Sequence, residues 1–113
     1  MTWLHVGTVG DIEDGEALKI DSVVPPIAVY YLDGEYYSTA DTCSHGQSSL
    51  SEGYVEEGTV ECVWHMAKFC LRTGAAETLP ATDPIRTYEV KIEDEAIYVL
   101  LDDSVIHRAT EPA

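Results

Sequence analysis

The sequence is poor in basic residues and rich in acidic ones. Six Lys and Arg residues stand against 21 Asp and Glu residues, so the formal net charge is −15 at pH 7. The phosphate backbone of nucleic acid and an anionic membrane surface would both repel such a chain. The charge therefore argues against these two classes of partner. It favours solubility and a steered encounter with a basic patch on another protein.

Cysteine and long apolar runs are also scarce. The chain has three cysteines, an odd number that does not suggest a disulfide framework and that fits a reducing compartment. The first residues, Met1 to His5, lack the basic region and the apolar core of a signal peptide. No apolar run approaches the length that a membrane span needs. The sequence therefore predicts a soluble protein of the cytoplasm with no membrane partner.

Helical periodicity is missing as well, since no segment longer than about ten residues shows it. Short runs bounded by turn signals predict strands instead, and Asp33-Gly34 and Glu57-Gly58 are two-residue hairpin signals. The pattern predicts an antiparallel all-β domain. Residues 104–113 show no pattern and are predicted to form a flexible tail. The predicted strands are Trp3 to Val6, Ala17 to Val23, Ile27 to Leu32, Glu35 to Thr39, Tyr54 to Glu56, Thr59 to Cys62, Phe69 to Arg72, Tyr88 to Ile92 and Ala96 to Leu101.

Two short runs that combine cysteine and histidine stand out in this chain. Cys43-Ser44-His45 and Cys62-Val63-Trp64-His65 each offer one thiolate and one imidazole. A classical zinc finger groups its two cysteines in one run and its two histidines in the other, so mixed runs fit that site poorly. They fit a [2Fe–2S] cluster in which two histidines replace two cysteines on one iron. A structural zinc site is the alternative.

No second group of histidines and carboxylates is visible that would hold a mononuclear iron. His5 and His107 stand alone near the two ends and are predicted to be surface residues. The length suits one domain with one modest core. The chain thus has residues for a redox centre but shows no place for substrate chemistry. This combination predicts an electron carrier rather than an enzyme.

The order C-x-H followed by C-x-x-H resembles that of Rieske iron–sulfur proteins. The segments Cys43 to Gly46, Leu50 to Gly53 and His65 to Gly74 are similar to the ferredoxin components of bacterial aromatic-ring-hydroxylating dioxygenases, such as the biphenyl, cumate and benzene dioxygenases. Cys70 is left over and is predicted to be a buried thiol on a strand. The resemblance implies one Rieske [2Fe–2S] cluster per chain, with four ligands: Cys43, His45, Cys62 and His65.

The resemblance also implies the Rieske iron–sulfur fold. In that fold, an antiparallel β-sandwich or barrel forms the base, and a small cluster-binding subdomain is inserted in it. For this chain we expect a single domain at residues 1–103, with the cluster-binding subdomain at about residues 42–82. We expect no second domain.

The implied partners are two other proteins of a dioxygenase system. A ferredoxin reductase that contains FAD and oxidises NADH would supply electrons one at a time. A terminal oxygenase with its own Rieske centre would receive them, and its pocket would select the aromatic substrate. The chain itself is expected to be a monomer. Three alternatives remain open: the Rieske ferredoxin of a diiron monooxygenase, the small Rieske subunit of a nitrite-reductase-like complex, and a zinc-stabilised binding module.

Two differences from the high-potential respiratory Rieske proteins predict a low midpoint potential. Those proteins carry Ser and Tyr hydrogen-bond donors two and four residues after the second ligand histidine, where this chain has Ala67 and Phe69. They also link their two loops by a disulfide, where this chain has Ser48 and Trp64. Hydrogen bonds to the cluster sulfur atoms stabilise the reduced state. We therefore expect a midpoint potential on the order of −150 mV, near the lower end of the Rieske range.

Overall fold

The computed structural model describes residues 2–42, 49–62, 67–77, 84–102 and 106–107. Within these ranges the regular structure is almost entirely β, and every strand pair is antiparallel. The prediction of an antiparallel all-β fold is therefore confirmed. The elements are β1 (Thr2–Thr8), β2 (Glu16–Ile20), β3 (Val23–Val24), β4 (Ile27–Leu32), β5 (Glu35–Ala40), the short 3-10 helix η1 (Leu50–Glu52), β6 (Tyr54–Glu56), β7 (Thr59–Glu61), β8 (Lys68–Cys70), β9 (Thr87–Tyr88), β10 (Val90–Glu93), β11 (Ala96–Leu101) and β12 (Ile106–His107).

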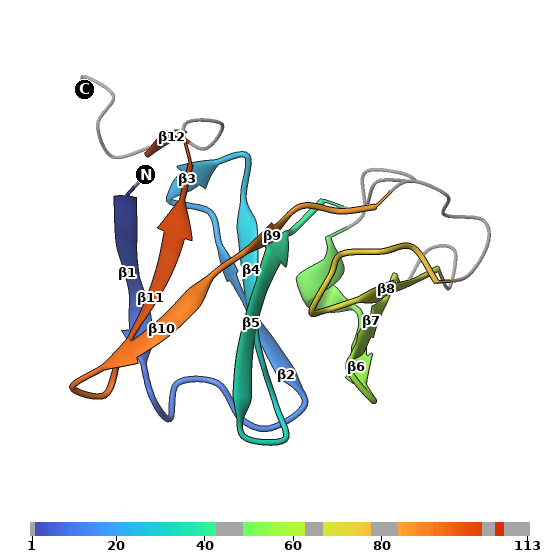
Figure 1. Cartoon of the computed structure of the whole chain (residues 1–113), viewed down its shortest axis with the longest axis horizontal. Helices are drawn as coiled ribbons and strands as arrows, with labels where there is room; N and C mark the ends of the chain where they lie inside the picture. The colour runs from blue at the N-terminus through green and yellow to red at the C-terminus, as the bar shows by residue number, and fades with distance from the viewer. Residues whose placement is uncertain (1, 43–48, 63–66, 78–83, 103–105, 108–113) are drawn as a thin grey trace.

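The molecule consists of a larger base and a smaller sheet beside it (Figure 1). The base contains a four-stranded sheet of order β2-β4-β5-β9 and a three-stranded sheet of order β1-β11-β10. The smaller sheet, β6-β7-β8, is formed by the chain between β5 and β9 and lies to one side of the base. A small β unit inserted in a larger β base is the architecture that the sequence predicted.

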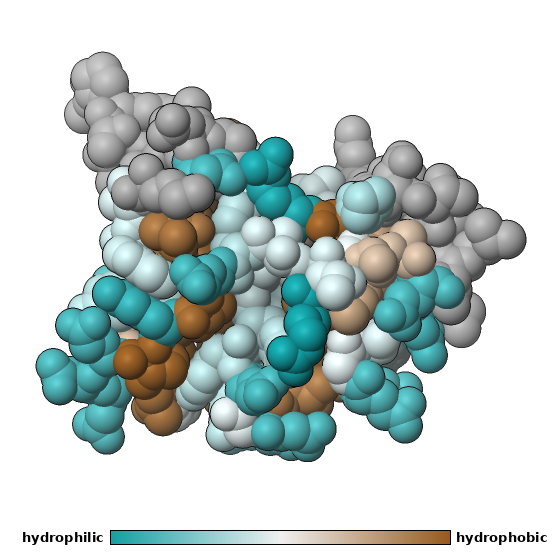
Figure 2. Space-filling model, viewed as in Figure 1, coloured by the Kyte–Doolittle hydropathy of each residue, from teal (hydrophilic) through white to brown (hydrophobic). Residues whose placement is uncertain are grey.

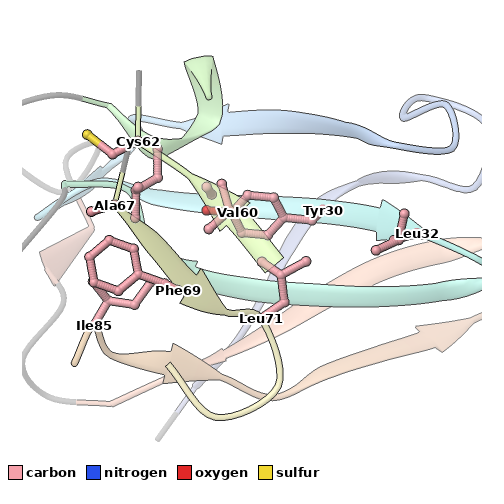
Figure 3. Packing of buried hydrophobic residues seen from close by; sticks show 10 residues of the cluster. Tyr30, Leu32, Val60, Cys62, Ala67, Phe69, Leu71 and Ile85 are labelled. Carbon is pink, nitrogen blue, oxygen red and sulfur yellow. The ribbon is translucent and has the colours of Figure 1, made fainter. Parts of the chain in front are cut away.

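β4 is buried on both of its faces, because successive side chains of a strand point to opposite sides. Ile27 and Val29 lie in one buried cluster, and Ala28, Tyr30 and Leu32 lie in another. The first cluster, here called the base core, lies between the two sheets of the base: Ile12, Val23, Ile27, Val29, Tyr88, Ile97, Val99 and Leu101. The second, here called the shared core, joins the base to the small sheet (Figure 3): Ala28, Tyr30, Leu32, Leu50, Val60, Cys62, Ala67, Phe69, Leu71 and Ile85.

Tyr30 is the largest fully buried side chain of the shared core. Its hydroxyl shares a hydrogen bond of 2.8 Å with Thr39 Oγ1 on β5, so this buried polar group has a partner. Burial raises the pKa of Tyr30 above its usual value. The phenol therefore stays neutral, and β4 and β5 remain linked through it across the pH range in which proteins normally fold.

The predicted strand from Tyr88 to Ile92 is two strands that belong to different sheets. Tyr88 in β9 pairs with Ser38 in β5, whereas Val90 in β10 pairs with Val99 in β11. The chain changes sheets at Glu89, as strands at the corner of a packed sandwich do. Because apolar and polar residues alternate through the corner without a break, no local sequence signal marks it. The alternation would place Tyr88, Val90 and Ile92 on one buried face, but Ile92 is 44% exposed, so this part of the prediction was wrong.

The structure differs from the predicted strand bounds at several places. β2 ends at Ile20, and Val23–Val24 forms the separate strand β3. The strand predicted to reach Arg72 ends at Cys70, where Gly74 N–H donates to the Cys70 carbonyl and closes a turn. In the predicted tail, residues 106–107 form β12 and pair with β3, so this part is not without structure. The remaining tail residues lie outside the described ranges.

The two predicted hairpin turns are confirmed. Asp33 and Gly34 have φ angles of 50° and 83°, and Glu57 and Gly58 have 51° and 78°. Positive φ at both central residues is the geometry of a type I′ turn, which glycine favours at the second position. The Glu57-Gly58 turn sets the register of β6 against β7, and β7 leads directly into Cys62.

We predict that Leu71→Ala lowers the free energy of unfolding by about 2–5 kcal/mol, because it opens a cavity in the shared core. Ile92→Ala is the matched control, since it removes an isomeric side chain at an exposed site, and it should cost less than about 1 kcal/mol. Urea unfolding followed by circular dichroism measures both effects. Equal losses in the two variants would contradict the assignment of Leu71 to the core.

Candidate metal centre

Of the four predicted ligands, Cys62 is the one that the structure describes. It follows the last residue of β7 and is fully buried in the shared core (Figure 3). Cys43, His45 and His65 lie outside the described residues. Within the described part of the chain, no three His, Cys, Asp or Glu side chains gather as a metal-binding group. The ligand set therefore stays a prediction, supported by the position of Cys62 and by the segments that flank the other three.

The chain on either side of residues 63–66 is closed by a backbone hydrogen bond. Cys62 N–H donates to the carbonyl of Ala67 over 2.8 Å. The next pair outward, Glu61 and Lys68, continues the ladder between β7 and β8. Both Cys62 and Ala67 are fully buried. The chain thus enters and leaves residues 63–66 at fixed points on the shared core.

The chain on either side of residues 43–48 is closed in the same way. Thr42 and Ser49 form an isolated antiparallel bridge. Leu50 N–H then donates to the carbonyl of Asp41 over 2.6 Å. Leu50 is fully buried in the same shared core as Cys62 and Ala67. Both cysteine–histidine runs are therefore anchored on one core, which is the arrangement that a centre held between two loops requires.

Gly53 fixes the distance between these two anchor points. A Cβ atom at Gly53 would overlap the carbonyl oxygen of Glu61, the residue before Cys62. Only glycine allows this close approach of backbone to backbone. The end of η1 therefore lies directly against the end of β7, and the motif Leu50 to Gly53 identified in the sequence packs the first run against the second.

Sequence reasoning missed Asp41, which is only 1% exposed. Its carboxylate accepts hydrogen bonds from Ser49 Oγ and from Ser51 N–H, on the far side of residues 43–48. The chain has 21 acidic residues, and no local sequence pattern distinguishes Asp41 from the others. Only the folded chain shows that it is buried and paired.

Cys70 is half-buried on β8 and belongs to neither buried core. The predicted position of Cys70 on a strand is confirmed, but the prediction that its thiol is buried was wrong. Cys70 pairs with Thr59 at the start of β7, whereas Cys62 follows the end of β7. Three residues of strand separate these positions by roughly 10 Å, so the two thiols are poorly placed to share one metal. A hydrogen bond with Thr73 lowers the pKa of the Cys70 thiol.

Arg72 forms an exposed contact between the turn after β8 and β5 of the base. Its Nη2 lies 3.1 Å from Glu35 Oε2, and its guanidinium lies over the ring of Tyr37, 5.7 Å from the centroid. Tyr37 O–H donates to the same Glu35 oxygen over 2.6 Å. That hydrogen bond, followed by the charge of Arg72, lowers the pKa of Glu35. The same bond raises the pKa of Tyr37, because ionisation would remove the donor.

A hollow of about 700 Å³ opens near this contact. It lies where the chain changes sheets, between β5, the β8 turn and β10. Glu35, Tyr37, Arg72, Val90 and Ile92 are among its lining residues, and Cys62 is not. The hollow and the predicted metal ligand are thus separate features. On the face of the base that is visible in Figure 2, brown hydrophobic residues are exposed among teal hydrophilic ones.

A family model described as the Rieske [2Fe-2S] domain matches residues 2–89. The chain belongs to this family. The match includes both cysteine–histidine runs and confirms the predicted family, fold and cofactor, a [2Fe–2S] cluster of the Rieske type. Among the described residues, no helix is long and apolar enough to cross a membrane.

Relatives of known name cover most of the chain. A protein from Photorhabdus laumondii named 3-phenylpropionate/cinnamic acid dioxygenase ferredoxin subunit is 49% identical over 104 residues, which are 91% of this chain and 98% of the relative. The solved ferredoxin of Sphingomonas yanoikuyae B1 has a TM-score of 0.83 at 35% identity, over 89% of this chain and 100% of that one. A chain in the complex of reduced oxygenase and oxidized ferredoxin of carbazole 1,9a-dioxygenase has a TM-score of 0.82 at 35% identity, over 86% and 100%.

The surroundings of Cys62 fit the group that the family implies. A cluster of this type takes thiolate ligands, and Cys62 places a sulfur atom at the anchored end of a loop. The fully buried neighbours Ala67 and Phe69 carry no side-chain hydrogen-bond donor. The thiol thus lies in the apolar shared core, beside two side chains that cannot donate a hydrogen bond to sulfur.

We predict that Tyr37→Phe removes a stabilisation limited to a window of pH. The lowered pKa of Glu35 gives stability that is present above the usual glutamate pKa, about 4.3, and is lost as pH falls through the folded-state value. The raised pKa of Tyr37 gives stability that is present below the usual tyrosine pKa, about 10, and is lost as pH rises through the folded-state value.

Urea midpoints of the native protein and Tyr37→Phe, measured from pH 3 to pH 11, test this prediction. The difference between them should be largest between about pH 5 and pH 9 and should shrink toward both ends. Tyr54→Phe is the control, because Tyr54 is 67% exposed, and its difference from the native protein should stay flat. A flat difference for Tyr37→Phe would contradict the coupling to Glu35.

Proposed function

We propose that the chain is the ferredoxin component of a bacterial aromatic-ring-hydroxylating dioxygenase. It carries one electron at a time from an NADH-oxidising flavin reductase to the terminal oxygenase. The observation that carries the proposal is the dioxygenase ferredoxin subunit that is 49% identical over nearly the whole of both chains. Such subunits are electron carriers, so the catalytic step belongs to the oxygenase and this chain is not itself an enzyme.

The proposed ligands of the cluster are Cys43, His45, Cys62 and His65. When bound, the cluster takes up and releases one electron. The chain's own part is to hold the ligands. Backbone hydrogen bonds close the ends of both runs on the shared core. We assign residues 1–103 to one Rieske domain and about residues 42–82 to its cluster-binding subdomain, whose described part is η1 and the sheet β6-β7-β8.

The proposed oxygenase partner has a counterpart among solved structures. The carbazole 1,9a-dioxygenase complex contains an oxygenase and a ferredoxin, and one of its chains matches 86% of this chain at 35% identity. A reductase partner, a monomeric state and a cytoplasmic location are part of the same proposal, and the likeness to dioxygenase ferredoxins supports them. A net charge of −15 supports steered encounters with basic patches on both partners, with rates that fall as salt rises.

Reconstitution with the reductase and oxygenase of the 3-phenylpropionate/cinnamic acid dioxygenase tests the function and the ligand set together. NADH-dependent dihydroxylation of the aromatic acid should require the native chain. Cys62→Ser should abolish it, because a cluster ligand is lost. Cys70→Ser is the matched control and should retain it, because Cys70 lies outside the shared core. Turnover with Cys62→Ser, or none with the native chain, would contradict the proposal.

The midpoint potential tests the role of the apolar residues beside the second run. We predict a native value on the order of −150 mV and a more positive value in Ala67→Ser, which supplies a donor where respiratory Rieske proteins have one. A hydrogen bond worth about 1 kcal/mol corresponds to roughly 40 mV for one electron.

Ala76→Ser is the control for this substitution. Ala76 packs against the same core and bridges Phe69, but it is not next to a predicted ligand run. Its potential should equal the native value. Spectroelectrochemical titration measures all three proteins, and an unchanged or lower potential in Ala67→Ser would contradict the prediction.

A further inference from the structure

Asp41 is a buried carboxylate that follows the last residue of β5 and lies two residues before Cys43. Its side chain is almost completely covered, although burying a carboxylate costs several kcal/mol unless its oxygens are paired. Neither buried core includes it. A role in apolar packing therefore does not explain why a charged residue occupies this position.

Hydrogen bonds from Asp41 close the chain around residues 43–48. Oδ2 accepts from Ser49 Oγ over 2.5 Å, and Oδ1 accepts from Ser51 N–H over 2.9 Å. The backbone carbonyl of Asp41 accepts from Leu50 N–H over 2.6 Å, and its N–H donates to the Pro26 carbonyl over 3.0 Å. One residue thus joins the segments on the two sides of residues 43–48 to each other and to the base.

Hydrogen-bond donors and a cation surround the carboxylate of Asp41. Ser49 Oγ and Ser51 N–H both donate to it, and the Lys19 ammonium lies 3.8 Å from Oδ2. Donors and a cation are the partners that a carboxylate anion takes. Lys19 is 45% exposed, so water weakens its compensation of the buried charge. An exposed ammonium at this distance therefore compensates a buried carboxylate charge only in part.

We propose that Asp41 is a positioning residue for the [2Fe–2S] centre. We propose also that the negative charge of Asp41 lowers the midpoint potential of that centre. Asp41 joins the described residues on the two sides of residues 43–48. Asp41 lies two residues before Cys43, so the Cα atoms of the two residues are at most about 7 Å apart. A buried negative charge at this range opposes the gain of an electron. The inference rests on the proposed ligand set.

The test compares two ion pairs in the intact, cluster-loaded protein. Asp41→Asn keeps the shape and one acceptor oxygen but removes the charge, so the midpoint potential should shift to a more positive value. Lys19→Gln leaves Asp41 uncompensated, so the potential should shift to a more negative value. Since Lys19 is a partly exposed surface residue, this variant reports the effect even if Asp41→Asn fails to fold.

The matched controls are Glu93→Gln and Lys91→Gln. In the native protein, Lys91 Nζ and Glu93 Oε2 form an ion pair of 3.3 Å on β10. The two substitutions change the net charge by the same amounts on β10, which does not adjoin residues 43–48 or 63–66 in the chain, and their potentials should equal the native value. Ser49→Ala keeps the charge of Asp41 but removes one hydrogen bond. It should lose iron to a chelator several-fold faster than the native protein.

Opposite shifts in the Asp41 and Lys19 variants, absent from the control pair, together with faster iron loss in Ser49→Ala, would support the proposal. Native potentials in both Asp41→Asn and Lys19→Gln, or equal shifts in the control pair, would overturn the role of Asp41 alone. If the native protein shows no Rieske spectrum, the ligand set fails first, and this inference fails with it.

Discussion

The two-sided burial of β4 is the constraint on which the rest of the structure depends. Alternate residues of this strand fill two different cores, one inside the base and one shared with the small sheet. The small sheet therefore has no separate hydrophobic core of its own in the described residues. It is held in place by packing against Ala28, Tyr30 and Leu32, and through them by the pairing of β4 with β2 and β5. A carrier benefits from this rigidity, since ligands fixed by a packed scaffold keep their geometry during electron gain and loss.

Polar contacts then place the ends of the two cysteine–histidine runs on this scaffold. The hydrogen bond from Cys62 to Ala67, the contacts of Asp41 and the close approach at Gly53 all lie at the run ends. Buried contacts of this kind are worth more than exposed ones. The exposed contact between Arg72 and Glu35 adds little stability to the same arrangement. The small sheet is thus positioned by the shared core first, by buried hydrogen bonds second, and by surface charge least.

Local signals predicted most of the fold. The apolar run of β4, the hairpin at Asp33-Gly34 and the strand β11 match the sequence prediction, because each depends on residues adjacent in the chain. The change of sheets at Glu89 and the pairing of β12 with β3 were missed, because both depend on distant partners. The family and cofactor were predicted from the Cys/His spacing and are confirmed by the family match. Asp41 could not be identified, since its burial exists only in the folded chain.

Low-temperature electron paramagnetic resonance of the dithionite-reduced protein tests the central claim most directly. The account predicts a spectrum with the low average g value that mixed histidine and cysteine ligation gives to a [2Fe–2S] cluster. A spectrum of the all-cysteine type would contradict the ligand set and bring Cys70 back as a candidate. A silent, colourless sample that contains zinc would contradict electron transfer altogether and would leave a metal-stabilised binding module.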